Sequence, residues 1–142
     1  MVNGEPRTAP DRRLVLLVLI ATAISSIFHY TDNFVRFDEY PQDDPELVSK
    51  ASIPVYWLLF TAFGVLGYFL VRRGSKLPAA ACLAVYAVSG LVSPLHYLHG
   101  SLSDFDGFQH AFIVSDGLLG LCVLLLAAKL ATARQPARIT PG

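Results

Sequence analysis

The chain has 142 residues, with 11 Lys or Arg and 11 Asp or Glu, so its formal net charge at pH 7 is zero. Hydrophobic residues make up 54% and charged residues only 15%, whereas soluble domains carry about 25% charged residues. This composition excludes an intrinsically disordered chain, which requires low hydrophobicity. It also argues against a nucleic-acid partner, because no basic excess is present to neutralise phosphates.

Four apolar segments follow one another along the chain. Residues 14–28 carry no charge, and an apolar helix that contains them could continue to about residue 35. Residues 53–71 and 77–95 are also uncharged, and residues 111–128 contain Asp116 as their one charged residue. A bilayer core about 30 Å thick requires roughly 20 apolar residues at about 1.5 Å per residue. The sequence therefore predicts an all-α integral membrane four-helix bundle, a single domain over residues 1–142, with transmembrane helices at about 13–35, 53–72, 77–99 and 109–132.

Proline and glycine mark the ends and bends of these helices. Pro54 and Pro78 lie just inside the second and third helices, where the missing N–H costs nothing. Gly74 interrupts the short basic segment between these two helices, which predicts an antiparallel hairpin. Pro94 removes a helical hydrogen bond and predicts a kink, and Gly100 is the expected end of the third helix.

Charge segregation predicts the orientation of the bundle. Nine of the 11 basic residues gather at one set of helix ends: Arg7, Arg12, Arg13, Arg72, Arg73, Lys76, Lys129, Arg134 and Arg138. The opposite ends carry most of the acids: Asp32, Asp38, Glu39, Asp43, Asp44, Glu46, Asp104 and Asp106. Because basic loops stay in the cytoplasm, both termini are expected inside, with two acidic loops, near residues 37–52 and 100–109, outside. The expected location is the bacterial cytoplasmic membrane, with the lipid bilayer as partner; a cleavable signal peptide is the alternative for the N-terminal segment.

All four histidines lie toward the predicted outer ends of the helices. At about 1.5 Å per residue, His29 lies about 22 Å from the inner end of its helix, His96 and His110 about 28 Å, and Asp116 about 20 Å. Asp32, at about 27 Å by the same count, and His99 fall near the same level. Three helices are thus predicted to deliver His and Asp side chains into one layer of the membrane.

Asp116 is the acid that requires most explanation, since a carboxylate in the membrane costs a few kcal/mol without a partner, a proton or a cavity. Depth alone nominates His29 as its partner. The alternative is a neutral Asp116 that bonds a hydroxyl or a backbone carbonyl and only holds helices together. For Asp32, the alternative to a functional role is a surface ion pair with Arg36, four residues along the same helix.

Imidazole and carboxylate together are ligands for transition metals. The sequence therefore predicts a site for Zn, Cu or Fe, with Asp116 or Asp32 as ligand or general base of a metal-dependent membrane enzyme acting on a lipid-soluble substrate. The candidate ligands are His29, Asp32, His96, His99, His110 and Asp116. A haem-binding or quinone-linked electron-transfer subunit is the second hypothesis, and an accessory membrane subunit without catalytic activity, bound to another membrane protein, is the third.

Two further features concern the outer surface of the bundle. Tyr30, Tyr56, Trp57 and Phe108 are spaced as an aromatic belt at the outer interface. Tyr40 and Pro41 are expected to fold the first outer loop back over the mouth of the bundle. Signatures of hydrolases, of nucleotide-binding loops and of dinucleotide-binding folds do not occur in the sequence.

Overall fold

A computed structural model describes residues 8–40 and 48–133, and their regular elements are all helical. The long helices are α1 (Arg12–Val35), α2 (Ser52–Arg72), α3 (Lys76–Leu91) and α5 (Gly107–Thr132). After α3, a 3-10 turn over Ser93–Leu95 leads into the short helix α4 (His96–His99). Two more 3-10 turns, η1 (Phe37–Glu39) and η3 (Leu102–Asp104), follow α1 and α4.

Four helical segments are long and apolar enough to cross a membrane: Arg12–Val35, Ser52–Arg72, Lys76–His99 and Gly107–Thr132. The predicted four-helix membrane protein is therefore confirmed at this level. The single domain, the side on which the termini lie and the exposure of the loops stay predictions. Pro41 and the loop acids Asp43, Asp44 and Glu46 lie outside the described residues.

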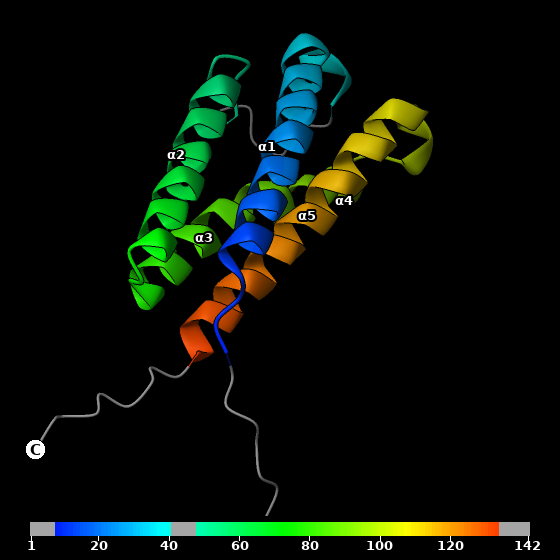
Figure 1. The fold of residues 1–142 in the computed structure, drawn as a ribbon. Coiled ribbons are helices and arrows are strands. Elements are labelled where there is room, and N and C mark those ends of the chain that lie inside the picture. The colour runs from blue at the N-terminus through cyan, green and yellow to red at the C-terminus, as the bar shows by residue number, and fades with distance from the viewer. Residues whose placement is uncertain (1–7, 41–47, 134–142) are drawn as a thin grey trace, which may run out of the picture.

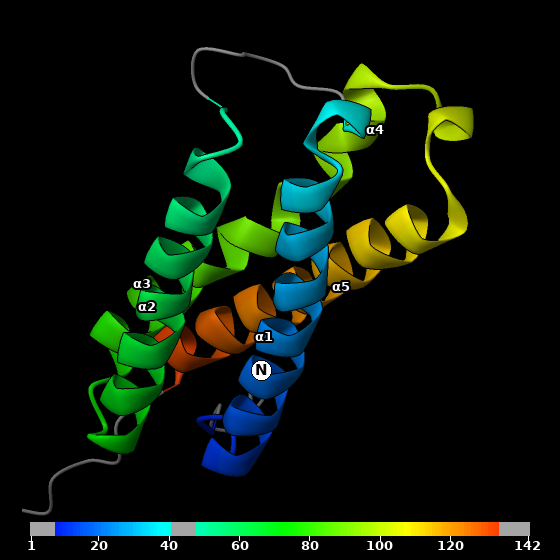
Figure 2. The ribbon, with the colours of Figure 1, turned by 90° about the horizontal axis from the view of Figure 1, so that it is seen from above.

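The basic ends of the four long helices gather at one end of the bundle, which we call the basic end (bottom of Figure 1). It carries Arg12, Arg13, Arg72, Arg73, Lys76 and Lys129. The opposite end, where His29, His96, His99 and His110 lie, is the histidine end. Seen from above, α1 and α2 lie with their axes roughly aligned but run in opposite directions, and α5 crosses them obliquely (Figure 2).

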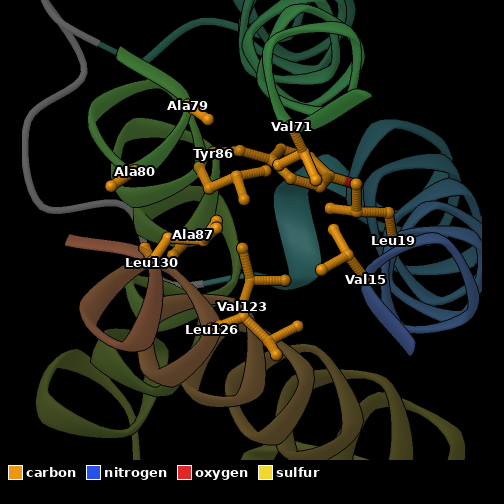
Figure 3. Packing of buried hydrophobic residues seen from close by; sticks show 12 residues of the cluster. Val15, Leu19, Val71, Ala79, Ala80, Tyr86, Ala87, Val123, Leu126 and Leu130 are labelled. Atoms are coloured by element: carbon orange, nitrogen blue, oxygen red, sulfur yellow. The ribbon is translucent and has the colours of Figure 1, made fainter. Parts of the chain in front are cut away.

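The apolar core fills the half of the bundle near the basic end. Val15 and Leu19 of α1 meet Ala87 of α3 and Val123 and Leu126 of α5 there (Figure 3). Tyr86 and Val71 close the same cluster from α3 and α2. A second, smaller cluster at the histidine end joins Tyr40, Phe105 and Ile113.

Glycines set the close approach of α3 and α5. A Cβ atom on Gly120 would lie 2.9 Å from the backbone N of Leu91 and 3.0 Å from the backbone O of Ala87. A Cβ atom on Gly90 would meet the backbone O of Asp116. Only glycine permits this backbone contact, which is the usual way in which membrane helices pack tightly. The contact fixes the height and rotation of α5 against α3.

The hairpin and the kink expected from glycine and proline are both present. Gly74 adopts a φ of 77° in the turn between α2 and α3, a conformation that favours glycine. Pro94 lies in the 3-10 turn that separates α3 from α4, and Gly100 follows the last residue of α4. The break turns Ser93 and His96 toward the interior of the bundle, where both line the same cavity.

Candidate functional site

A cavity of about 200 Å³, lined by both apolar and polar residues, opens at the histidine end between α1, α2 and the broken third span. We call it the histidine cavity. Its polar lining comes from α1, from the start of α2 and from the segment around the break: His29, Tyr30, Asn33, Tyr56, Ser89, Ser93, His96 and His99. Three of the six candidate ligand residues therefore share one cavity. Their imidazoles come from α1 and α4, as the depth argument required.

Two buried polar atoms of cavity-lining residues have no hydrogen-bond partner. His29 is only 3% exposed, and its Nδ1 is unpartnered. One helical turn further along α1, the Oδ1 of Asn33 is also buried and unpartnered. Leaving such an atom buried and unsatisfied costs about 1–3 kcal/mol. The described residues thus supply no hydrogen-bond partner for either atom.

His96 is the centre of the contacts in the cavity. Its ring centroid lies 5.8 Å from that of His29, and its Nε2 lies 3.4 Å from the Nδ2 of Asn33. The amide N–H donates to this nitrogen when the imidazole proton is on Nδ1. The contact orients Asn33 so that its unpartnered oxygen and the His29 ring belong to the same cavity.

An aromatic cap covers the two histidines from the end of the bundle. Tyr40 is only 2% exposed, and its ring lies 6.2 Å from that of His29 and 4.9 Å from that of His96, measured between centroids. The ring of Phe105 packs against Tyr40 in a tilted arrangement, with 6.1 Å between centroids. The chain that follows α1 thus folds back over the mouth of the bundle, as predicted for Tyr40.

The cap is anchored by ion pairs at Arg36. The Tyr40 hydroxyl donates to Asp32 Oδ2 at 2.6 Å, and Arg36 donates to both carboxylate oxygens of Asp32 at 3.0 and 3.1 Å. Arg36 Nη1 also donates to Asp106 at 2.6 Å. Because Asp106 accepts from the backbone N of Phe108 and caps α5, this group ties the end of α1 to the start of α5. We call Arg36, Asp32 and Asp106 the clasp.

The clasp shifts the acid–base properties of its members outside the spans. Arg36, by its hydrogen bond, holds the pKa of Asp106 down at about 2. The hydrogen bonds to Asp106 and Asp32 in turn raise the pKa of Arg36. Burial, and after it the bond to Asp32, raises the pKa of the Tyr40 hydroxyl. The pKa shifts of Asp106, Arg36 and Tyr40 all move titration away from neutral pH.

The remaining candidate ligands lie elsewhere. Asp32 serves the clasp, which confirms the ion pair with Arg36 that was the alternative to a ligand role. His110 packs against Tyr97, whose hydroxyl lies 2.9 Å from His110 Nδ1. Asp116 is fully buried and accepts a hydrogen bond from Ser93 at 3.2 Å, so the partner predicted from depth, His29, is replaced by a serine.

Within residues 8–40 and 48–133, no group of three or more His, Cys, Asp or Glu side chains is placed to hold a metal ion. The single metal centre predicted from six residues is thus not supported. The reason is the direction in which each side chain points around its helix. The number of residues along a helix gives the depth of a side chain in the membrane, but it does not give the direction in which that side chain points. Asp32 turns to Arg36, and His110 turns to the aromatic residues outside the cavity.

An apolar cavity of about 300 Å³ adjoins the histidine cavity on the side of α1 and α2. The two share Tyr30 and Ile53 as lining residues. The rest of the apolar cavity is lined by Ile27, Thr31, Phe34, Pro54 and Trp57. The Trp57 indole N–H donates to Ser26 Oγ at 3.2 Å, which fixes the ring in this wall. Three of the four residues predicted as an aromatic belt, Tyr30, Tyr56 and Trp57, therefore line these cavities.

Sequence reasoning did not single out Asn33 or Ser93 as functional candidates. Asn33 could have been found, since it follows His29 by four residues and so shares its helix face. Ser93 carries no such signal, because its direction depends on how the helix breaks before Pro94. Asn and Ser are common residue types, so only their neighbours in the folded structure mark these two as candidates.

In comparisons with protein-family models, with curated proteins and with solved structures, no match to the chain was found. The fold and the cavity together define a helical bundle whose four long apolar segments fit a membrane protein, with a histidine-lined cavity near one end of the bundle.

Proposed function

We propose that the protein binds a lipid-soluble ligand with a hydroxyl-bearing head group, such as a quinol or another phenol. The observation that carries this proposal is the pair of unpartnered buried atoms, His29 Nδ1 and Asn33 Oδ1, in residues that line one cavity. A ligand hydroxyl donates to the Asn33 oxygen, and a second polar atom of the head group bonds His29. Two such bonds remove two penalties of about 1–3 kcal/mol each.

The neighbouring cavity supplies the apolar part of the site. It shares Tyr30 and Ile53 with the histidine cavity, so a molecule with its head among the imidazoles places its tail against Trp57 and Phe34. Small-molecule sites are typically of this kind, mostly apolar with a few placed polar groups. The combination favours an amphipathic ligand over a small water-soluble one.

The cap argues for access from the bilayer. Tyr40 and Phe105 cover the histidines at the end of the bundle, and the clasp holds Tyr40 there through Asp32. The apolar cavity lies instead between two membrane-crossing helices, α1 and α2. With the basic end in the cytoplasm, as the charge distribution favours, the ligand reaches the site from the outer leaflet.

A metal ion is the competing occupant, because His29, His96 and His99 line the same cavity. Two or three imidazoles with open coordination positions are a plausible zinc-type donor set, although the described residues show no placed group of three. Haem is the other occupant considered from the sequence. The binding of a metal ion or of haem can be told apart from the binding of a phenol by the titrations and the absorption spectrum described below.

The test uses the only tryptophan of the chain, Trp57, which lies in the wall of the apolar cavity. The protein is placed in lipid nanodiscs and titrated with decylhydroquinone while tryptophan fluorescence is recorded. We expect saturable quenching. Asn33→Leu and His29→Leu should each weaken binding about tenfold, the equivalent of about 1.4 kcal/mol. His110→Gln is the matched control, since His110 does not line either cavity.

Parallel titration with Zn²⁺ and an absorption spectrum separate the alternatives. Quenching that does not saturate, or that His29→Leu and Asn33→Leu leave unchanged, would refute the proposed ligand class. Saturable Zn²⁺ binding that is lost in His29→Leu would favour a metal site instead. A Soret band of the purified protein would favour haem.

A further inference from the structure

Asp116 of α5 lies beside the break in the third span, where it contacts Ser93, a residue that lines the histidine cavity. Asp116 is 0% exposed, and its Oδ2 accepts a hydrogen bond from the Ser93 hydroxyl at 3.2 Å. Its other oxygen, Oδ1, is buried and has no hydrogen-bond partner. The ion pairs of the described residues all involve Arg36, so none of them reaches Asp116.

The surroundings of Asp116 favour a neutral carboxyl group. The titratable groups that interact with it are the hydroxyls of Tyr30 on α1 and Tyr86 on α3, neither of which is a cation. On the α3 side, the backbone of α5 at Asp116 is packed directly against Gly90, which leaves no space for a counter-ion. An ionised carboxylate in a membrane interior requires a charged partner or water, and the neutral hydroxyls of Ser93 and Ser25 that interact with Asp116 carry no positive charge.

Ser93 connects this carboxyl group to the cavity. It is 2% exposed, belongs to the 3-10 turn between α3 and α4, and lines the histidine cavity together with His29 and Asn33. Its hydroxyl contacts Asp116 directly. A hydroxyl group both donates and accepts a hydrogen bond and rotates to suit its partners. Ser93 is therefore the one side chain shown both to bond the carboxyl and to line the cavity.

We propose that Asp116 holds an exchangeable proton and passes it through the Ser93 hydroxyl to whatever polar molecule occupies the histidine cavity. For the transfer, the Ser93 hydroxyl turns so that its Oγ accepts a hydrogen bond from the Asp116 O–H and its own O–H donates to a base in the cavity. The Asp116 proton then moves to Ser93 Oγ while the Ser93 proton moves to that base. The carboxyl group becomes a carboxylate, and the reverse transfer restores it; no electron changes hands. Asp116 is the proton store and Ser93 the relay. The step does not depend on the ligand proposed above, because water in the cavity accepts the same proton.

Infrared spectroscopy of the protein in nanodiscs tests the proton store. We expect a carbonyl band of a protonated carboxylic acid at neutral pH, and we expect Asp116→Asn to remove it. After transfer into D₂O the band shifts as the proton exchanges, and its rate reports access to the cavity. Spectra of the wild type and of Asp116→Asn that do not differ in this band would overturn the proposal.

Two Ser93 variants test the relay while leaving Asp116 in place. Ser93→Ala should slow the exchange about tenfold or more, since a positioned proton-transfer group typically contributes at least that much. Ser93→Thr, which retains the hydroxyl, should exchange at a rate close to that of the wild type. The control is Ser101→Ala, at a 3-10 turn outside the cavity. Equal exchange in Ser93→Ala and wild type would overturn the relay, whatever the hydroquinone titration shows.

Discussion

Tyr40 offers the sharpest test of how the cavity is closed. Its ring contacts His29, His96 and Phe105, and its hydroxyl donates to Asp32. Tyr40→Ala removes a buried aromatic ring and should cost about 3–5 kcal/mol of unfolding free energy. Tyr40→Phe removes only a hydrogen bond to a charged group, about 1.5–3 kcal/mol. We expect the lower end of that range, because Arg36 still donates two bonds to Asp32.

The two variants should differ more in access than in stability. Modification of histidines by diethyl pyrocarbonate, followed by mass spectrometry, measures how fast water-soluble reagent reaches each ring. In the wild type and in Tyr40→Phe, His29 and His96 should react slowly because the ring still covers them. In Tyr40→Ala both should react much faster, while the reactivity of His110 should change little.

Equal reactivity of His29 in all three proteins would refute this reasoning. If His29 reacts quickly in the wild type, the cap does not exclude water and access from the bilayer loses its support. If it stays slow in Tyr40→Ala, a part of the chain other than Tyr40 closes the cavity. Unfolding in detergent, followed by Trp57 fluorescence, shows that each variant is folded during the measurement.

Three other consequences follow from packing and charge. Gly120→Ala places a methyl group within 3.0 Å of the α3 backbone and should lower stability by about 1–3 kcal/mol, whereas Gly107→Ala, with nothing within 4 Å, should not. The pKa of Asp106 is lowered from 3.8 to about 2, so its stabilising contribution is complete above the higher value and is lost as the pH falls toward the lower one. Thermal unfolding should accordingly show the wild type losing its advantage over Asp106→Asn only across that acidic interval. Arg36→Gln should release both acids of the clasp and speed His29 modification, as Tyr40→Ala does.

Most of the fold could be predicted from the sequence, because the lengths of the apolar segments and the positions of the charges can be read directly along the chain. The uncharged runs predicted four membrane-crossing helices, and the structure has them. Pro94 and Gly74 act through local backbone chemistry, so the break and the turn that they predicted are also present. Sidedness rests on the charge distribution alone and stays a prediction.

The candidate site was only partly accessible, since it depends on rotation and on contacts between distant segments. Counting residues brought His29 and His96 to one level, where they share a cavity. The four-residue spacing offered the Asp32–Arg36 ion pair, but depth could not decide between that pair and a ligand role, nor show that His110 packs against Tyr97. These directions are set by the approach of α3 to α5 at Gly90 and Gly120 and by the helix break. Neither the close approach of α3 and α5 nor the helix break can be inferred from the spacing of the candidate ligands along the sequence.

Photo-crosslinking tests the central claim most directly, because it reports where a lipid-soluble phenol binds. A hydroquinone that carries a diazirine on its head group is irradiated with the protein in nanodiscs, and the labelled peptides are identified by mass spectrometry. The account predicts labels on the α1 segment around His29 and Asn33 and on the segment around Ser93 and His96, with competition by unlabelled decylhydroquinone. Labels spread over the exposed faces of α2 and α5, without competition, would contradict it.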